Sequence, residues 1–238
     1  MKEGIIGILG GMGPEATLYL FQEIIKHTGA KRDQDHFRIL IDNNPKIPDR
    51  TPAILGGGET PLPMMIETAK NLEKAGADFI TIPCVSAHYF IKELRRAISI
   101  PVISIIDEVA AEIQRSLPEI NRIGLIATTG TIRSGLFQER LSEVGVEVLV
   151  PSEETQEKLV MSAIYGESGI KAGFVSSENK EKVLKASNEM LERGAEGIIG
   201  GCTEVPLVLQ QNDIEVPFFD SLDILALAAI RRARHRSS

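Results

Sequence analysis

Residues 75–88 read AGADFITIPCVSAH, which is a helix end, an apolar strand and then a cysteine. Residues 193–206 read RGAEGIIGGCTEVP and repeat this design, so that Cys202 lies 118 positions after Cys84. Open parallel sheets bind their ligands just beyond the carboxyl ends of the strands. The two cysteines, which are the only ones in the chain, therefore mark equivalent candidate ligand-binding positions.

Short apolar runs alternate with amphipathic segments around the first cysteine. The expected elements of this half are strands over residues 5–9, 37–41 and 101–104 and helices from residue 15, over 63–74 and over 89–97. The buried stripe of the first helix is expected to comprise Leu18, Phe21, Ile24 and Ile25. Such alternation predicts a mainly parallel sheet with helices on both faces, a three-layer α/β/α domain. The loop over 45–58, rich in proline and glycine, is expected to be irregular and either functional or mobile.

The same pattern restarts in the second half of the chain. Residues 123–127 echo residues 6–10, and residues 216–219 echo residues 100–103. Repeated order at nearly constant spacing indicates two similar α/β halves related by a pseudo-twofold axis. Such an axis would carry Cys84 onto Cys202, and a ligand in the cleft between the domains would meet one sulfur on each side.

Composition excludes several classes of function. The chain has 238 residues, 43% of them hydrophobic and 25% charged, and a net charge of −7, which argues against a nucleic-acid partner. No apolar run approaches the roughly 20 residues that span a bilayer. Two cysteines without a recognisable signal peptide predict a reducing, cytoplasmic setting. The basic run over 231–236 is interpreted as the cationic end of the last helix rather than a nucleic-acid patch.

Three roles other than catalysis are possible for the cysteine pair. A disulfide is disfavoured in the cytosol. A zinc site needs about four ligands, and His88 is the only histidine near a cysteine. A single cysteine is most often inert core, but two at matching strand ends, followed by Ser86 and Thr203, favour paired reactive thiols.

Four motifs together resemble the cofactor-independent aspartate/glutamate racemases, most closely their aspartate racemase-like branch, along essentially the whole chain. These motifs are GGMGPEAT from residue 10, NNPKIPDRT from residue 43, the first cysteine motif with Pro83, Cys84, Ala87 and His88, and GCTE from residue 201. The resemblance implies that one thiolate removes the Cα proton while the other thiol donates a proton from the opposite face. Cys84 would act on the D-isomer and Cys202 on the L-isomer. A small amino acid is then the substrate, aspartate first, with glutamate or a broader range as the other possibility.

The resemblance also implies an organisation for the chain. A first domain over residues 1–104 plus 219–238 would carry Cys84, and a second over 105–218 would carry Cys202. No cofactor, pyridoxal phosphate included, and no metal is expected. A homodimer is expected, although the apolar last helix from Leu222 to Ala229 could equally be ordinary core.

Several further residues are expected to hold the substrate. Arg50, by its motif, and Lys171, on a glycine-flanked lid, would contact carboxylates. Ser86, Thr203, Thr129 and Thr131 would donate to the developing enediolate, while the last two could instead cap the following helix. The remaining expected contacts are Met12, Asn43, Val85 and Glu204. His88 could tune the first thiol or simply be a core or capping histidine.

One departure from the family pattern affects the substrate more than the reaction class. The family usually follows its first cysteine with Asn-Thr, whereas this chain has Val85 and Ser86. Valine neither donates nor accepts, so either Glu204 or Asn43 holds the amino group or the preferred substrate is not aspartate. The alternatives are an isomerase of another acid, such as maleate, and a non-catalytic amino-acid sensor. A dinucleotide fingerprint at residues 11–16 is disfavoured because the chain is short for a two-domain dehydrogenase.

Overall fold

The computed structural model describes residues 3–235. The chain forms two compact units, one made of the segment up to Glu108 with the segment from Leu222 onward, the other of Val109–Ser221. These boundaries lie a few residues beyond the expected ones, because the chain leaves the first unit inside α5 (Ile105–Ser116) and returns to it at α11 (Ser221–Arg234). Residues 1–2 and 236–238 of the expected first domain, Arg236 of the basic run included, lie outside the described residues.

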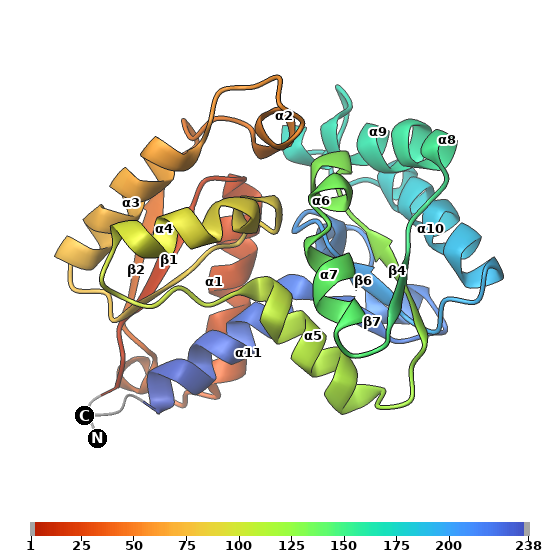
Figure 1. Cartoon of the computed structure of the whole chain (residues 1–238). Helices are drawn as coiled ribbons and strands as arrows, with labels where there is room; N and C mark the ends of the chain where they lie inside the picture. Colours follow the sequence, from red (N-terminus) through yellow and green to blue (C-terminus); the bar gives the residue numbers. More distant parts are fainter. Residues whose placement is uncertain (1–2, 236–238) are drawn as a thin grey trace. The chain divides into compact units, whose positions relative to one another are not determined.

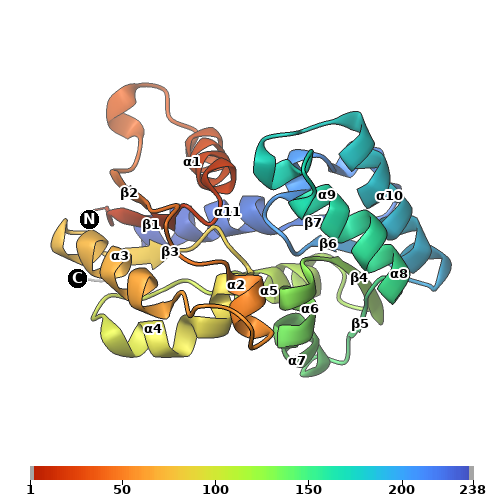
Figure 2. The same ribbon diagram turned by 90° about the horizontal axis from the view of Figure 1, so that it is seen from above.

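The first unit is a parallel sheet of order β2-β1-β3 with helices on both faces (Figure 1). Its elements, besides the first turn of α5 and the helix α11, are β1 (Ile6–Gly10), α1 (Pro14–Thr28), η1 (Asp33–Asp35), β2 (Ile39–Asn43), α2 (Arg50–Ile54), α3 (Leu62–Lys74), β3 (Phe79–Thr81), η2 (Ser86–Phe90) and α4 (Ile91–Ala97). Seen from above, α1 and α11 lie on one side of this sheet and α3 and α4 on the other (Figure 2). The predicted three-layer α/β/α organisation is confirmed for this unit.

The predicted buried stripe of α1 is largely wrong. Leu18 and Ile25 are 51% and 41% exposed, and Phe21 is half-buried. Only Ile24 of the predicted four is buried, and the helix buries instead a face that includes Ala16, Thr17, Leu20 and Glu23. The reason is local: the Thr17 hydroxyl accepts from Gly11 N at 3.0 Å and donates to Gly13 O, which turns this face toward the end of β1.

Two other expectations for the first unit change. The loop over 45–58 contains a helical turn, α2, which Asp49 caps by accepting from Thr51 N at 2.9 Å. The strand expected over 101–104 reduces to one parallel bridge between Val102 and Ile80. It keeps the two flanking hydrogen bonds, Ile80 N to Pro101 O and Ile103 N to Ile80 O.

The second unit is a parallel sheet of order β5-β4-β6-β7. Its elements are β4 (Arg122–Ile126), α6 (Thr129–Ser134), α7 (Leu136–Ser142), β5 (Glu147–Leu149), α8 (Glu153–Thr155), the π-helix η3 (Gln156–Met161), α9 (Ser162–Tyr165), η4 (Ile170–Ala172), α10 (Ser177–Glu192), β6 (Ile198–Gly200), η5 (Val205–Leu207), η6 (Gln211–Asp213) and β7 (Phe218–Asp220). Counting the Val102 bridge as a fourth strand, the first unit has the same strand order. The internal repeat predicted from sequence is therefore a repeat of architecture.

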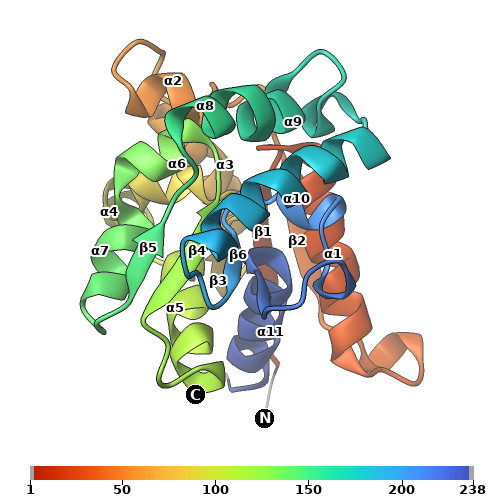
Figure 3. The same ribbon diagram turned by 90° about the vertical axis from the view of Figure 1, so that its right-hand side faces the viewer.

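Glycines in the second sheet allow helices to pack closely on both faces. A Cβ on Gly124 would lie 3.1 Å from Met190 of α10, and a Cβ on Gly201 would lie 3.3 Å from Phe137 of α7. Figure 3 shows α10 lying across β4 and β6. Because successive strand residues point to opposite faces, these contacts lie on both sides of the sheet, and its central strands β6 and, from Ile123 onward, β4 are buried.

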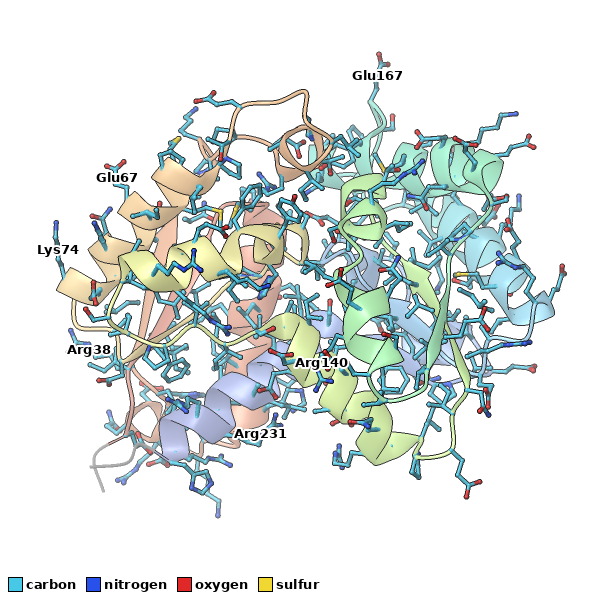
Figure 4. The ribbon with its side chains drawn as sticks, viewed as in Figure 1. Arg38, Glu67, Lys74, Arg140, Glu167 and Arg231 are labelled. Atoms are coloured by element: carbon cyan, nitrogen blue, oxygen red, sulfur yellow. The ribbon has the colours of Figure 1, made fainter. Side chains whose placement is uncertain are left out.

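The last helix belongs to the core of the first unit. Leu222, Leu225, Ala226 and Ala229 of α11 are fully buried. Arg231, labelled in Figure 4, is exposed on this helix and pairs with Glu108 at 2.7 Å. Within residues 3–235, no helix combines the length and the apolar character that a membrane span requires.

Candidate active site

Both cysteines are free thiols that follow the third strand of their own unit. Cys84 comes three residues after β3 and is 4% exposed, whereas Cys202 comes two residues after β6 and is 6% exposed. In each sheet the strand before the cysteine pairs in parallel with the first strand of that unit. The cysteines therefore occupy equivalent positions in two similar sheets, at the edge where α/β folds bind ligands.

Cys84 has a hydroxyl and a histidine as its polar surroundings. Its Sγ lies 3.5 Å from the hydroxyl of Ser86, within reach of a sulfur hydrogen bond. The side chain of His88 is buried, with Nδ1 2.9 Å from the carbonyl of Cys84 and Nε2 accepting from the backbone N–H of Ile105 at 3.1 Å. Since Nε2 accepts, Nδ1 carries the proton and donates to Cys84.

His88 is a neutral, positioning histidine. Burial lowers its pKa to about 4, more than its hydrogen bonds to Cys84 and the neighbouring backbone raise it. An imidazole that is neutral at pH 7 supplies no positive charge to a thiolate. It ties the turn that carries Cys84 to the start of α5, which favours the core interpretation of this residue over the tuning one.

Cys202 lies beside a buried carboxylate. Its Sγ donates to Glu204 Oε2 at 2.9 Å, and the Thr203 hydroxyl donates to the same oxygen at 3.2 Å. Lys171, from η4, donates to Glu204 Oε1 at 2.5 Å and lies over the ring of Tyr165. Cys202, Thr203 and Lys171 thus form one hydrogen-bonded network around Glu204, and Lys171 lies 33 positions before Glu204 in the sequence.

The charges of this network act on the thiol in opposite directions. Burial and the Glu204 carboxylate raise the pKa of Cys202, and the Lys171 ammonium opposes them. Burial alone would raise the pKa of Glu204, but Lys171 and the hydrogen bonds from Cys202 and Thr203 outweigh it and lower that pKa. The proton of this pair therefore resides on sulfur and the negative charge on Glu204.

Arg50 is buried, unlike a solvated loop arginine. Its Nη2 donates to Met12 O at 3.0 Å, and its Nη1 donates to Pro48 O at 3.0 Å. These contacts bring together two predicted site residues from separate motifs and hold the guanidinium in one orientation. Asn43, at the end of β2, is exposed, and the side chain of Val85 is buried.

Of the threonines that follow β4, one caps the next helix, α6. The cap of α6 is Thr128, whose hydroxyl accepts from Thr131 N at 3.3 Å, so neither Thr129 nor Thr131 is the capping residue. Thr129 Oγ1 instead donates to Glu157 at 3.0 Å and accepts from Gln156. Sequence reasoning missed Gln156, which sits in a π-helical turn and carries no motif.

The predicted site residues divide equally between the two units. The first unit holds Met12, Asn43, Arg50, Cys84, Val85 and Ser86, and the second holds Thr129, Thr131, Lys171, Cys202, Thr203 and Glu204. Direct contacts join Met12 to Arg50, Cys84 to Ser86, and Lys171 with Thr203 and Cys202 around Glu204. Lys171 follows a loop that begins at Gly166, after the end of α9. The side chain of Glu167 in this loop projects away from the rest of the unit (Figure 4).

One group of side chains in the described part of the chain has the spacing of metal ligands. Glu23, His27 and Asp223 of α1 and α11 place three ligand atoms within 4.8 Å of one another. His27 Nε2 lies 2.5 Å from Asp223 and 3.3 Å from Glu23, and Lys26 pairs with Glu23. The His27–Asp223 hydrogen bond and the Lys26–Glu23 ion pair involve all three side chains.

Comparison with known proteins defines the class. The model of the Asp/Glu/hydantoin racemase family matches residues 9–229. The chain is 28% identical over 230 residues to the broad specificity amino-acid racemase RacX of Bacillus subtilis, covering 95% of this chain and 96% of that protein. The aspartate racemase of Picrophilus torridus superposes with a TM-score of 0.83 at 27% identity, over 99% of this chain and 96% of the other.

A further solved structure, an aspartate racemase homologue from Pyrococcus horikoshii, is 32% identical with a TM-score of 0.77, over 99% of this chain and 100% of that one. The chain therefore belongs to the Asp/Glu/hydantoin racemase family. The two-sheet parallel α/β fold predicted from sequence is the fold of these relatives.

Proposed function

We propose that this protein is a cofactor-independent amino-acid racemase, with aspartate as the first candidate substrate and glutamate or a broader range next. The observation that carries the proposal is the pair of free cysteines at equivalent positions of two similar sheets in a member of this family. Two exchangeable thiols are the minimum that inversion through opposite-face proton transfer requires.

In the proposed reaction a thiolate takes the proton from Cα and becomes a thiol. The electron pair left on carbon delocalises into the α-carboxylate, and the second thiol donates its proton to the opposite face and becomes a thiolate. Backbone N–H groups and the hydroxyls of Ser86 and Thr203 are the donors suited to the developing charge. Reversal of the two roles gives the reverse reaction without any other reactant.

Two cations are proposed to hold the substrate's carboxylates. Arg50 presents a guanidinium that backbone carbonyls already orient, so little side-chain entropy is lost on binding. Lys171 is the second candidate, in competition with Glu204. With a buried valine at position 85, Glu204 and Asn43 remain the candidates for the amino group. This departure is the reason to test more than aspartate.

The other interpretations are less favoured. RacX and the Picrophilus torridus protein are amino-acid racemases, which does not favour an isomerase of maleate or a sensor without catalysis. Exchange of the Cα proton distinguishes an enzyme from a sensor, and ultraviolet loss of a double bond would reveal the maleate reaction.

The deciding experiment is α-hydrogen exchange in D₂O, followed by NMR on L- and D-aspartate, L- and D-glutamate and then a wider amino-acid panel. We expect deuterium incorporation with inversion on at least one acidic amino acid. If the amino acids raise the melting temperature of the protein, and so bind to it, but none of them exchanges its α-hydrogen, the racemase proposal is contradicted and a sensor is supported.

We also propose that the protein is a cytoplasmic homodimer. Leu18 and Ile25 are exposed on one face of α1, seven residues apart and so two turns along the helix, and Ile41 is exposed on edge strand β2. Large apolar residues exposed on one helix face, as Leu18 and Ile25 are, are typical of interfaces. Light scattering should give twice the 26.0 kDa of one chain. Leu18→Glu with Ile25→Glu should give the mass of one chain, and a dimer that survives both changes excludes this face.

A further inference from the structure

Three side chains of the second unit form an uninterrupted polar chain that ends on a thiol. Cys202 Sγ donates to one oxygen of Glu204 at 2.9 Å, and the other oxygen of Glu204 accepts from Lys171 at 2.5 Å. The first contact depends on a tight turn, in which Val205 N donates to Cys202 O at 2.9 Å and folds position 204 back toward position 202. By contrast, the neighbour of the Cys84 sulfur is a neutral hydroxyl.

Burial makes these contacts strong. The side chains of Glu204 and Lys171 are 3% and 20% exposed, so the carboxylate is almost completely withdrawn from water. Charges in such a setting are screened far less than surface charges. A carboxylate that close to sulfur accepts a hydrogen bond from the thiol but repels the thiolate.

We propose that Glu204 is a positioning residue that keeps the proton on Cys202 in the resting protein, and that Lys171 sets how strongly it does so. The inference deepens the proposed racemase function, because it assigns the resting protonation state of one of the two thiols. The opposing effects of Glu204 and Lys171 on the pKa of Cys202 agree with the geometry.

This assignment makes the two thiols unequal before substrate arrives. Cys202 is then already protonated when Cys84 removes the Cα proton of one isomer, and it can donate its proton to the opposite face. For the other isomer Cys202 must first lose its proton against the field of Glu204. The two directions of the reaction should therefore depend differently on pH, and Glu204 should be the cause of the difference.

The test uses the full chain in a Cys84→Ser background, where Cys202 is the single cysteine. Titration of the ultraviolet absorbance of the thiolate, after subtraction of the curve of the Cys84→Ser/Cys202→Ser protein to remove the contribution of the three tyrosines, then reports Cys202 alone. Glu204→Gln should move the midpoint to lower pH, with about tenfold more thiolate at a fixed pH on the acidic side, as expected for removal of one adjacent charge. Lys171→Met should move it to higher pH.

The control is Glu154→Gln, which also removes an acid from a lysine pair, here the exposed pair with Lys158 at 2.8 Å. It should leave the midpoint unchanged. A purely structural role for Glu204 would not give opposite shifts in the two site variants. Equal midpoints in all variants, or a shift of Glu204→Gln to higher pH, overturns the proposal, and circular dichroism verifies that each variant is folded.

A second readout separates this inference from the proposed function. In protein with both cysteines, Glu204→Gln should move the acidic limb of the pH profile of kcat/KM to lower pH for the enantiomer that needs Cys202 as base. If no turnover is found on any amino acid, the proposed function fails while the titration still decides the role of Glu204.

Discussion

Replacement of either cysteine by serine should lower the racemisation rate by about 10²–10⁴-fold, the range that a positioned acid or base contributes. Serine keeps the shape of the side chain but has a far less acidic hydroxyl, so it can neither remove nor return the Cα proton at neutral pH. Because inversion needs a donor on one face and an acceptor on the other, Cys84→Ser and Cys202→Ser should each cause this loss in both directions of the reaction. Polarimetry or chiral chromatography measures the loss from both enantiomers.

Ser86→Ala serves as the matched control for the cysteine variants. It removes the hydroxyl 3.5 Å from the Cys84 sulfur but leaves both thiols in place. We expect partial activity here, above that of either cysteine variant. Racemisation at the unmodified rate in Cys84→Ser or in Cys202→Ser, with the fold verified by circular dichroism, would exclude the two-thiol mechanism.

The free energy of unfolding should fall by roughly 3 kcal/mol as pH decreases from about 6.5 to about 4, because of His88 alone. The pKa of His88 in the folded protein is lowered to about 4, from 6.5. Between these values the unfolded chain binds a proton that the folded chain does not, so acid favours unfolding. This contribution to stability is complete above the unfolded pKa and is lost as pH falls toward the folded one.

Urea unfolding at several pH values measures this dependence, and His88→Asn isolates the part due to His88. Asparagine retains a side-chain N–H that can donate to the Cys84 carbonyl, but it does not titrate. The variant should show a flatter curve between pH 6.5 and 5, above the range where most carboxylates titrate. A variant curve parallel to the unmodified one would show that His88 does not cause the acid sensitivity.

Much of the fold could be predicted from local patterns of apolar and polar residues in the sequence. Apolar runs of strand length, each followed by an amphipathic segment, predict parallel strands with covering helices. The matching segments around Cys84 and Cys202 predict two similar units. The stripe of α1 was mispredicted, because apolar periodicity alone does not say which face of a helix meets the sheet. The short α2 was missed, since prolines and glycines around Arg50 obscure a single helical turn.

The two cysteines could be identified as candidate catalytic residues from the sequence alone, because they are the only cysteines in the chain and follow repeated strand patterns. The groups that surround each thiol, by contrast, follow from the tertiary structure. A hydrogen bond from Ile105 to His88 and an ion pair between Lys171 and Glu204 join residues far apart along the chain. Burial then gives those contacts their strength, since water no longer screens the charges. Distance and burial are properties of packing, and together they raise the pKa of Cys202.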